Sequence, residues 1–141
     1  SYYRRTAESR SLDLAWMFEG IEDQEILGDF GFSGGGAAGF ELDRADVRLG
    51  TPEEVRVVAS SENHTSSFVL VPEEMLTHIT NWPGEEEQQK LIRSDIVYFR
   101  TPSGGEVFST GSITFCGSLP WNDFENNISR LLENVIRRFL Q

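Results

Sequence analysis

The stretch NDFENNISRLLENVIRRF, residues 122–139, decides the fold that this sequence predicts. Asn122, with Glu125 three residues later, is typical of a helix N-cap and its capping box. Arg137 and Arg138 fall in the last turn, where cations suit the negative end of the helix dipole. Apolar side chains recur at steps of three or four residues, as one buried face of a helix requires: Phe124, Ile128, Leu131, Val135 and Phe139. The stretch therefore predicts one long C-terminal helix.

The segments before this helix favour a sheet. A strand over 95–101 (DIVYFRT) and a second strand, or a broken pair, over 105–118 (GEVFSTGSITFCGS) flank a Pro-Ser-Gly-Gly turn. This order is typical of a hairpin whose glycines supply positive φ. Further strands are predicted over 54–60 (EVRVVAS) and 67–71 (SFVLV), which are rich in β-branched and other apolar residues.

Three other segments carry weaker signals. The run 15–21 (AWMFEGI) indicates a short buried strand. Residues 39–43 (GFELD) alternate apolar and polar, so the two kinds of side chain are expected on opposite faces of a strand. The segment 72–82 begins with Pro-Glu-Glu, which suits a helix N-terminus and indicates a short helix. A surface loop is predicted over 82–87 (WPGEEE).

Together these segments predict a single α+β domain over residues 1–141. Its sheet is expected to be mixed and mostly antiparallel, with the long C-terminal helix packed on it. A parallel α/β domain would need several crossover helices, and the sequence offers one clear helix and one doubtful one. No internal repeat or linker divides the chain.

Composition restricts the partners of this domain. Its formal net charge is −11, and binding to nucleic acid or an anionic membrane requires Lys and Arg to neutralise phosphates. We therefore expect no nucleic-acid partner and no membrane partner. No apolar run approaches the 18 residues of a membrane-spanning helix. The single cysteine, Cys116, excludes an internal disulfide and favours a reducing, cytoplasmic compartment.

The run SGGGAAG, residues 33–39, is open to three interpretations. A phosphate-binding loop would need a lysine, or a helix following the glycines. Here acidic residues and a strand-like pattern follow instead. The run therefore favours a tight or closely packed loop into which side chains do not fit. A loop lining a ligand cleft is the remaining alternative.

Glu41 and Asp43 are the first candidate site residues. Carboxylates at alternate strand positions share a face, so the two could bind a hard cation or act as acid and base. Arg44 sits beside Glu41, Asp43 and Asp46 and could instead pair with one of them. The competing interpretation is that these charges lie on the exposed side of an edge strand.

The loop SSENHT, residues 60–65, supplies the other candidates, Glu62 and His64. The loop follows a predicted strand end, where open α/β sheets place their chemistry. The pair could serve as base and orienter or as metal ligands, although a histidine in a surface loop is more often simply solvated. Cys116 is expected to be a buried, inert thiol. No complete catalytic set is visible, and we assign no metal ligand.

Several segments together resemble the C-terminal region of the N,N-dimethylformamidase large (beta) subunit family. The pattern is one of glycines, aromatics and acids, and it covers nearly the whole chain. The segments are WMFEGI (16–21), LGDFG (27–31), GGGAAGFELDRAD (34–46), LGTP (49–52), VVASSENH (57–64), the stretch 94–119, NN (126–127) and ENV (133–135).

The resemblance implies an amidohydrolase that splits formamides into formate and an amine. It implies a large subunit with a glutamine-amidotransferase-like α/β domain, a mononuclear iron held by tyrosines and a glutamate, and an accompanying small subunit. The iron glutamate of the family lies in a His-x-Glu-Tyr-Trp type segment, which this sequence lacks. Tyr2, Tyr3 and Tyr98 do not stand in the family's ligand contexts. We therefore expect the tail of the large subunit, without the metal site and inactive alone.

Three hypotheses for function follow. The first is a piece of a formamide-type amidohydrolase whose partners are the remainder of the large subunit and the small subunit. The second is a non-catalytic module that docks onto a subunit, which suits the charge of −11. The third is a carbohydrate- or ligand-binding domain that uses Trp82 and Trp121. Association with a second copy of the chain is also open.

Overall fold

The computed structural model describes residues 1–78 and 84–141. Four strands form one sheet in the order β1-β2-β3-β4, and each neighbouring pair is antiparallel. The strands are β1 (Tyr2–Arg5), β2 (Arg56–Glu62), β3 (Asp95–Arg100) and β4 (Glu106–Ser109). Together with the helices, this arrangement confirms the predicted α+β class. The sheet was expected to be mixed, and in the described chain it is antiparallel throughout.

The hairpin β3–β4 forms as predicted. Val97 pairs with Ser109 and Arg100 with Glu106, and the amide of Thr101 donates to the carbonyl of Gly105 across the turn at 2.8 Å. The pairing between β2 and β3 shifts register between Val57 and Ala59. This irregularity leaves Val58 and Ala59, two consecutive residues, both buried.

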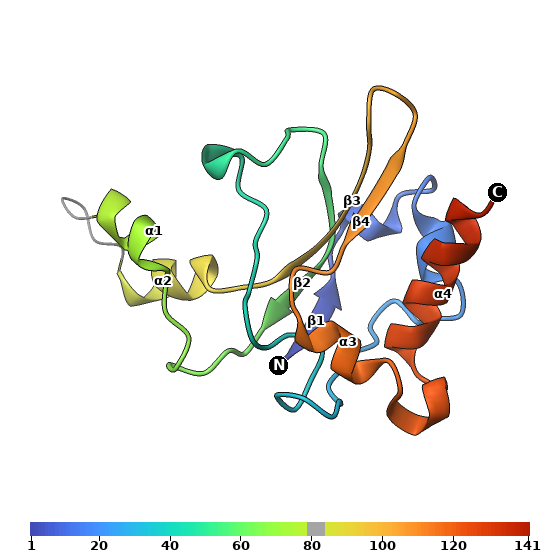
Figure 1. Cartoon of the computed structure of the whole chain (residues 1–141), viewed down its shortest axis with the longest axis horizontal. Coiled ribbons are helices and arrows are strands. Elements are labelled where there is room, and N and C mark those ends of the chain that lie inside the picture. Colours follow the sequence, from blue (N-terminus) through green and yellow to red (C-terminus); the bar gives the residue numbers. More distant parts are fainter. Residues whose placement is uncertain (79–83) are drawn as a thin grey trace.

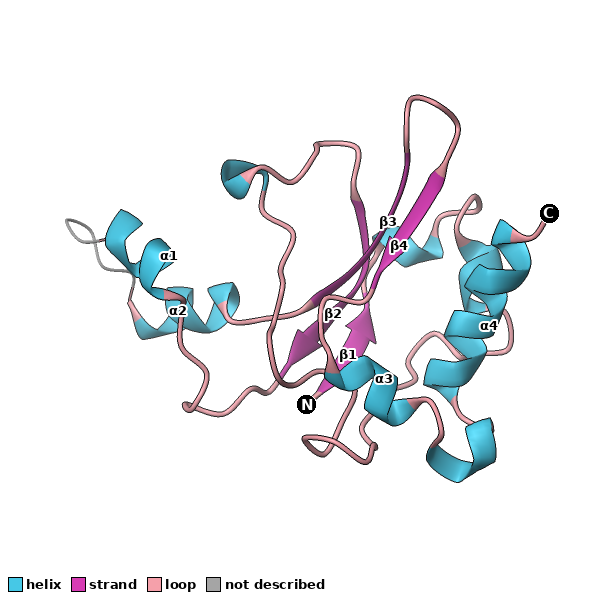
Figure 2. Ribbon diagram, in the orientation of Figure 1, coloured by secondary structure: helices cyan, strands magenta, loops and turns pink. Residues whose placement is uncertain are grey.

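The helices lie at two ends of the sheet (Figures 1 and 2). They are α1 (Pro72–Thr77), α2 (Glu85–Leu91), α3 (Thr114–Ser118) and α4 (Asn127–Phe139), with short 3₁₀ turns η1 (Glu8–Arg10), η2 (Ala15–Phe18), η3 (Val47–Leu49) and η4 (Trp121–Phe124). Helix α4 runs beside the N-terminal 3₁₀ turns, while α1 and α2 project at the opposite end. No described helix is both long and apolar enough to cross a bilayer.

Helix α4 covers the core with three of the five apolar residues predicted for its buried face; Phe139 is exposed, and Phe124 is exposed and precedes the helix. Ile128, Leu131 and Val135 are buried on its inner face. Its cap differs from the prediction, because Asn126, and not Asn122, accepts a hydrogen bond, from the amide of Ser129 at 2.9 Å. The preceding residues 122–124 adopt left-handed backbone angles, so the helix begins at Asn127.

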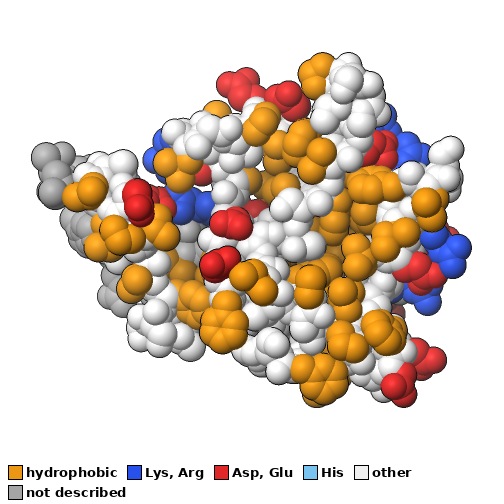
Figure 3. All heavy atoms as spheres, viewed as in Figure 1, with side chains coloured by type: hydrophobic (Ala, Val, Ile, Leu, Met, Phe, Trp, Pro, Cys, Tyr) orange, Lys and Arg blue, Asp and Glu red, His pale blue; other side chains and the backbone are white. Residues whose placement is uncertain are grey.

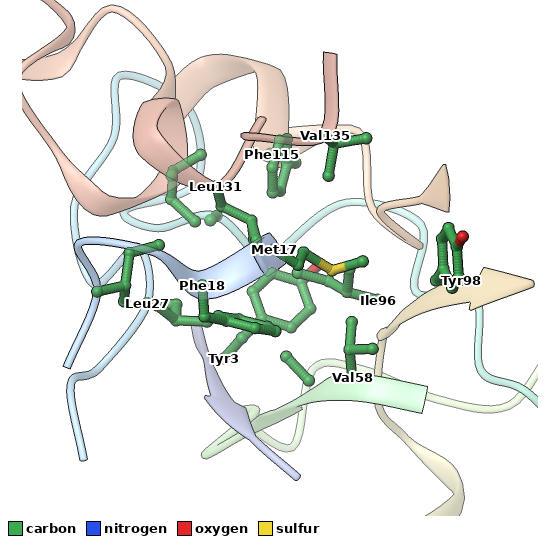
Figure 4. Close-up of a cluster of buried hydrophobic side chains, with 14 of the residues drawn as sticks. Tyr3, Met17, Phe18, Leu27, Val58, Ile96, Tyr98, Phe115, Leu131 and Val135 are labelled. Carbon is green, nitrogen blue, oxygen red and sulfur yellow. The ribbon is translucent and has the colours of Figure 1, made fainter. Parts of the chain in front are cut away.

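The core lies between the sheet and α4 (Figure 4). Tyr3, Val58 and Ile96 enter it from three neighbouring strands, and Leu131 enters it from α4. The Tyr3 hydroxyl lies 2.8 Å from both the Ser94 hydroxyl and the Thr110 carbonyl, so its polar atom is satisfied. Burial raises the pKa of Tyr3 far above its ordinary value.

Several predicted strands are wrong. The run 15–21 contains the 3₁₀ turn η2, and its buried Met17 and Phe18 are adjacent residues turned into the core by helical geometry. Residues 67–71 and 39–43 form no strand in the described chain. The second of these turns at Glu41, whose φ is +55°, which breaks the expected alternation. Apolar composition alone did not distinguish these three segments from strands. A strand also needs a neighbouring strand to pair with, and none of the three pairs in the sheet of the described chain.

The predictions for two other segments are partly wrong. The strand expected over 105–118 ends at Ser109, and residues 114–118 form α3. Cys116 lies on that helix and is exposed, not buried. Helix α1 confirms the start of the short helix predicted over 72–82, but α1 ends at Thr77. The predicted end at residue 82 lies outside the described residues. The loop predicted over 82–87 begins outside them and gives way to α2 at Glu85.

The glycine run is closely packed at its third glycine. A Cβ atom on Gly36 would lie 2.1 Å from the carbonyl oxygen of Ser1. The next amide, of Ala37, donates to the carbonyl of Gly28 at 2.8 Å. Gly34 and Gly35 have φ of +66° and +70°, which side chains rarely adopt. The run therefore works as a structural loop, which is the interpretation that the sequence favoured.

Candidate functional site

A cleft of about 1020 Å³ opens beyond the end of β2. The loop that follows β2 forms one wall, and α1 and α2 form the other. Its lining is mixed, with apolar Phe68, Met75 and Ile92 beside polar Ser61, His64 and Arg93. A large cavity with an apolar lining and a few polar groups is the usual form of a ligand-binding site.

A serine–histidine pair lies in the wall of this cleft. Asn63 has a φ of +60° and turns the chain after β2. His64 Nε2 consequently lies 2.6 Å from Ser61 Oγ, and the Phe68 ring packs edge-on against the imidazole with centroids 4.9 Å apart. The turn is what brings residue 64 back over the strand that carries residue 61.

Ser61 and His64 form one hydrogen-bonded pair. Ser61 Oγ accepts from the amide of Ser94 at 2.7 Å, and which atom donates between Ser61 Oγ and His64 Nε2 depends on the tautomer of the ring. His64 Nδ1 is buried and has no hydrogen-bond partner in the described part of the chain. Burial, with a smaller contribution from the charged amino terminus, lowers the pKa of His64. The imidazole is therefore neutral at neutral pH.

This pair lacks what a nucleophilic serine needs. A serine hydroxyl is activated when a base takes its proton and a third group orients that base. Within residues 1–78 and 84–141, no group bonds to His64 Nδ1. Ser61 itself is only 6% exposed. The pair can orient the loop, but it does not present an attacking oxygen.

Glu62 and His64 engage different partners. Glu62 ends β2, and its carboxylate accepts from Arg4 Nε on β1 at 2.7 Å. Both members of this ion pair are nearly half exposed, so it contributes little to stability. The sequence suggested that Glu62 and His64 could act together as base and orienter. In the structure Glu62 bonds to Arg4 and His64 bonds to Ser61, so the two residues do not bond to each other.

Glu41 and Asp43 do not line the cleft. Both side chains are exposed. The backbone of Asp43 is bonded instead, since its amide donates to Gly111 and its carbonyl accepts from Asp95, at 2.8 and 2.9 Å. A catalytic role for either residue stays a prediction, as it does for Glu62 and His64.

Arg44 ties the neighbouring segment to the helical arm formed by α1 and α2. Its guanidinium donates to Glu74 on α1 at 2.9 Å, to the Leu91 carbonyl at the end of α2 at 3.2 Å, and to Asp46 at 3.1 Å. Arg44, Asp46 and Glu74 side chains are at most 10% exposed. The sequence left open which neighbouring acid Arg44 pairs with, and it held no signal for Glu74, which is 30 residues away.

Another buried carboxylate, that of Asp95, lies where β3 begins after α2. Asp95 accepts from Arg93 Nε at 3.0 Å, from Ser60 Oγ at 2.6 Å and from the amide of Ala45 at 2.9 Å. Its charge is thus paired and bonded, as burial requires. A carboxylate at the start of an apolar strand was the one available signal of this role.

The described residues do not fit a metal site. No three His, Cys, Asp or Glu side chains among them converge as ligands. Glu62 is engaged by Arg4, and His64 Nε2 by Ser61. The Tyr3 hydroxyl is bonded within the core, and that of Tyr98 accepts from Arg100 at 3.3 Å. These groups offer no open tyrosine-and-carboxylate set for iron.

Comparison with known proteins identifies relatives for this arrangement. Residues 1–128 match a family described as "N,N-dimethylformamidase beta subunit-like, C-terminal". The chain is 40% identical over 140 residues to the N,N-dimethylformamidase beta subunit of an Alcaligenes species, and 40% identical over the same length to that of Paracoccus aminophilus. Each match covers 99% of this chain and 18% of the relative.

Proposed function

We propose, on the premise that this chain belongs to the N,N-dimethylformamidase beta subunit-like C-terminal family, that it forms the C-terminal part of the large subunit of a formamide-hydrolysing amidohydrolase. The reaction would split a formamide C–N bond to give formate and an amine. The observation that carries the proposal is 40% identity over 99% of the chain. The resemblance seen in the sequence is thereby confirmed at the level of the family.

The iron that this family implies would be held by another part of the large subunit. The donor groups described above are engaged or dispersed, and so they support this assignment. We further propose that the remainder of the large subunit carries the glutamine-amidotransferase-like domain and that a small subunit accompanies the large subunit. The chain spans 18% of the length of its relatives, which leaves most of each relative for these roles.

The part played by this chain would be architectural. Its sheet and α4 form one core, and the buried Arg44 cluster holds the helical arm beside the cleft. The cleft wall around Ser61 and His64 would face the remainder of the subunit or a ligand bound there. A purely docking module is the second candidate, favoured by the exposed apolar side chains Val69 and Leu76 at the arm.

Deletion of residues 1–141 from the large subunit tests the proposal. Co-expressed with the small subunit, the intact large subunit should release dimethylamine from dimethylformamide, and the truncated one should not. Full activity of the truncated enzyme, or an intact enzyme that releases no amine from any formamide, would contradict the proposed function.

The 141-residue chain by itself should bind no stoichiometric iron or zinc and release no amine. Elemental analysis and an amine assay measure the two properties. One metal per chain, lost in Glu62→Ala or His64→Ala, would place a metal site in the cleft and overturn this assignment.

A further inference from the structure

An exposed cluster of aromatic rings lies beyond α3. We call Phe30, Phe32, Trp121 and Phe124 the aromatic patch. The Trp121 ring lies 5.9 Å from that of Phe30 and 5.2 Å from that of Phe32. Phe32 is 71% exposed, Phe124 64% and Trp121 39%. Figure 3 shows hydrophobic side chains gathered over the lower part of this face, where Figure 1 places α3 and the loops below it.

The loop that carries Phe30 and Phe32 is fastened to α3. The Ser118 hydroxyl donates to the carbonyl of Phe30 at 2.6 Å, and the amide of Phe32 donates to the carbonyl of Gly117 at 3.0 Å. A Cβ atom on Gly31 would lie 2.6 Å from Ser118 Oγ, so glycine is needed for this close approach. Two hydrogen bonds and one close approach therefore hold the half-buried Phe30 and the exposed Phe32 next to α3.

The turn that carries Trp121 and Phe124 is strained. Asn122, Asp123 and Phe124 have φ of +50°, +53° and +68°. Three consecutive left-handed residues are unfavourable, most of all at a bulky phenylalanine. Asn126 opposes the strain, because its side-chain amide donates to the carbonyls of Leu119 and Trp121 at 3.0 and 2.7 Å. Strain maintained by the surrounding structure is a pointer to function.

The occupant of this surface follows from the length of the relatives and from charge. Most of each relative's length lies outside this chain. A second copy is disfavoured, since an isologous contact brings the same surface patch of the two copies together. It would oppose the exposed acids Asp29, Asp123 and Glu125 to one another. An apolar surface bordered by Lys or Arg would satisfy both the rings and these acids.

We propose that the aromatic patch is the surface on which this chain docks onto the remainder of its own large subunit, against apolar side chains bordered by basic residues. The inference rests on the proposed function, because it takes the remainder of the subunit as given. It adds the contact surface and the chemistry of the opposing face.

Cys116 provides a probe of docking in the full-length large subunit with its small subunit. The thiol is exposed on α3, the helix to which the patch is fastened. In the wild-type complex, alkylation of Cys116 by iodoacetamide, followed by peptide mass spectrometry, should be slow. Phe32→Ser should accelerate it at least tenfold, and Asp123→Arg should also accelerate it. These positions are exposed, so neither variant disturbs the core.

Leu12→Ser, between η1 and η2, is the matched control. It removes an apolar side chain that is at least as exposed as those of the patch, and it should leave the alkylation rate of Cys116 unchanged. Equal rates in the wild type, Phe32→Ser and Asp123→Arg would overturn the inference. Protection that disappears on dilution would overturn it too, because the occupant would then be a separate chain, either a second copy or the small subunit. A complex that hydrolyses dimethylformamide while Cys116 stays reactive would refute the docking surface and leave the proposed function intact.

Discussion

Removal of the Arg44 guanidinium should detach the helical arm from the rest of the domain. In Arg44→Ala, the buried Glu74 carboxylate loses its cation, and the Leu91 carbonyl loses a donor. Breaking one side of a buried ion pair costs about 3–5 kcal/mol. Asp46 keeps Arg48 as a partner, and Glu74 can reach water if α1 moves outward. Both effects reduce the penalty, and we expect a loss of about 2–3 kcal/mol in the free energy of unfolding.

Arg48→Ala is the matched control for this change. Arg48 donates to the same Asp46 but is 73% exposed, whereas Arg44 is 8% exposed. Exposed ion pairs contribute roughly 0–1 kcal/mol, so this variant should unfold almost as the wild type does. Arg48→Ala removes a guanidinium from Asp46 alone, whereas Arg44→Ala removes one from both Asp46 and Glu74. The contrast therefore reports the loss of the buried contacts of Arg44.

Urea denaturation and amide hydrogen exchange measure the two parts of this prediction. The exchange of α1 and α2 amides should rise in Arg44→Ala, while that of α4 stays unchanged. Arg44→Ala/Glu74→Ala should recover part of the lost stability, since no buried charge is then left without a partner. If Arg44→Ala were no more destabilising than Arg48→Ala, the assignment of Arg44 as the clamp of the arm would be wrong.

Three further outcomes are expected. In thermal melts, Gly36→Ala should destabilise the domain by more than about 2 kcal/mol, because its Cβ atom would clash with the Ser1 carbonyl. Gly35→Ala should cost about 1 kcal/mol, because its Cβ atom has free space and only the positive φ is unfavourable. Equal losses would contradict the packing at Gly36. Asn126→Ala should cost about 1–2 kcal/mol and Asn122→Ala far less, since only the first caps α4; the reverse order would restore the cap predicted from sequence. The depressed pKa of His64 means that its stabilising effect is present above the ordinary histidine pKa and is lost as pH falls through the lower, folded value. The melting temperature should therefore decrease as the pH is lowered below about 6.5, and it should decrease less in His64→Gln. Identical pH profiles of the melting temperature in the two proteins would exclude this linkage.

The sequence by itself determined the elements whose signals are local. The apolar positions of α4 recur at helical spacing over thirteen residues, and three of them are buried as expected. The hairpin β3–β4 and the strand β2 were equally visible, because alternation, β-branched side chains and a glycine turn all lie within a few residues of one another. The family pattern was likewise contained in the letters, and the comparisons confirm it.

Tertiary structure alone decided the short apolar runs and the site. Residues 15–18 form a 3₁₀ turn because α4 holds that segment, with Asn134 donating to the carbonyl of Met17 at 3.0 Å. A run of four apolar residues is compatible with either a strand or a turn, and only the neighbouring element selects between them. The contacts of Arg44 with Glu74 and of Ser61 with Ser94 span 30 and 33 residues. Such contacts leave no trace in local periodicity, because burial of a polar group depends on which distant groups the completed fold brings to it.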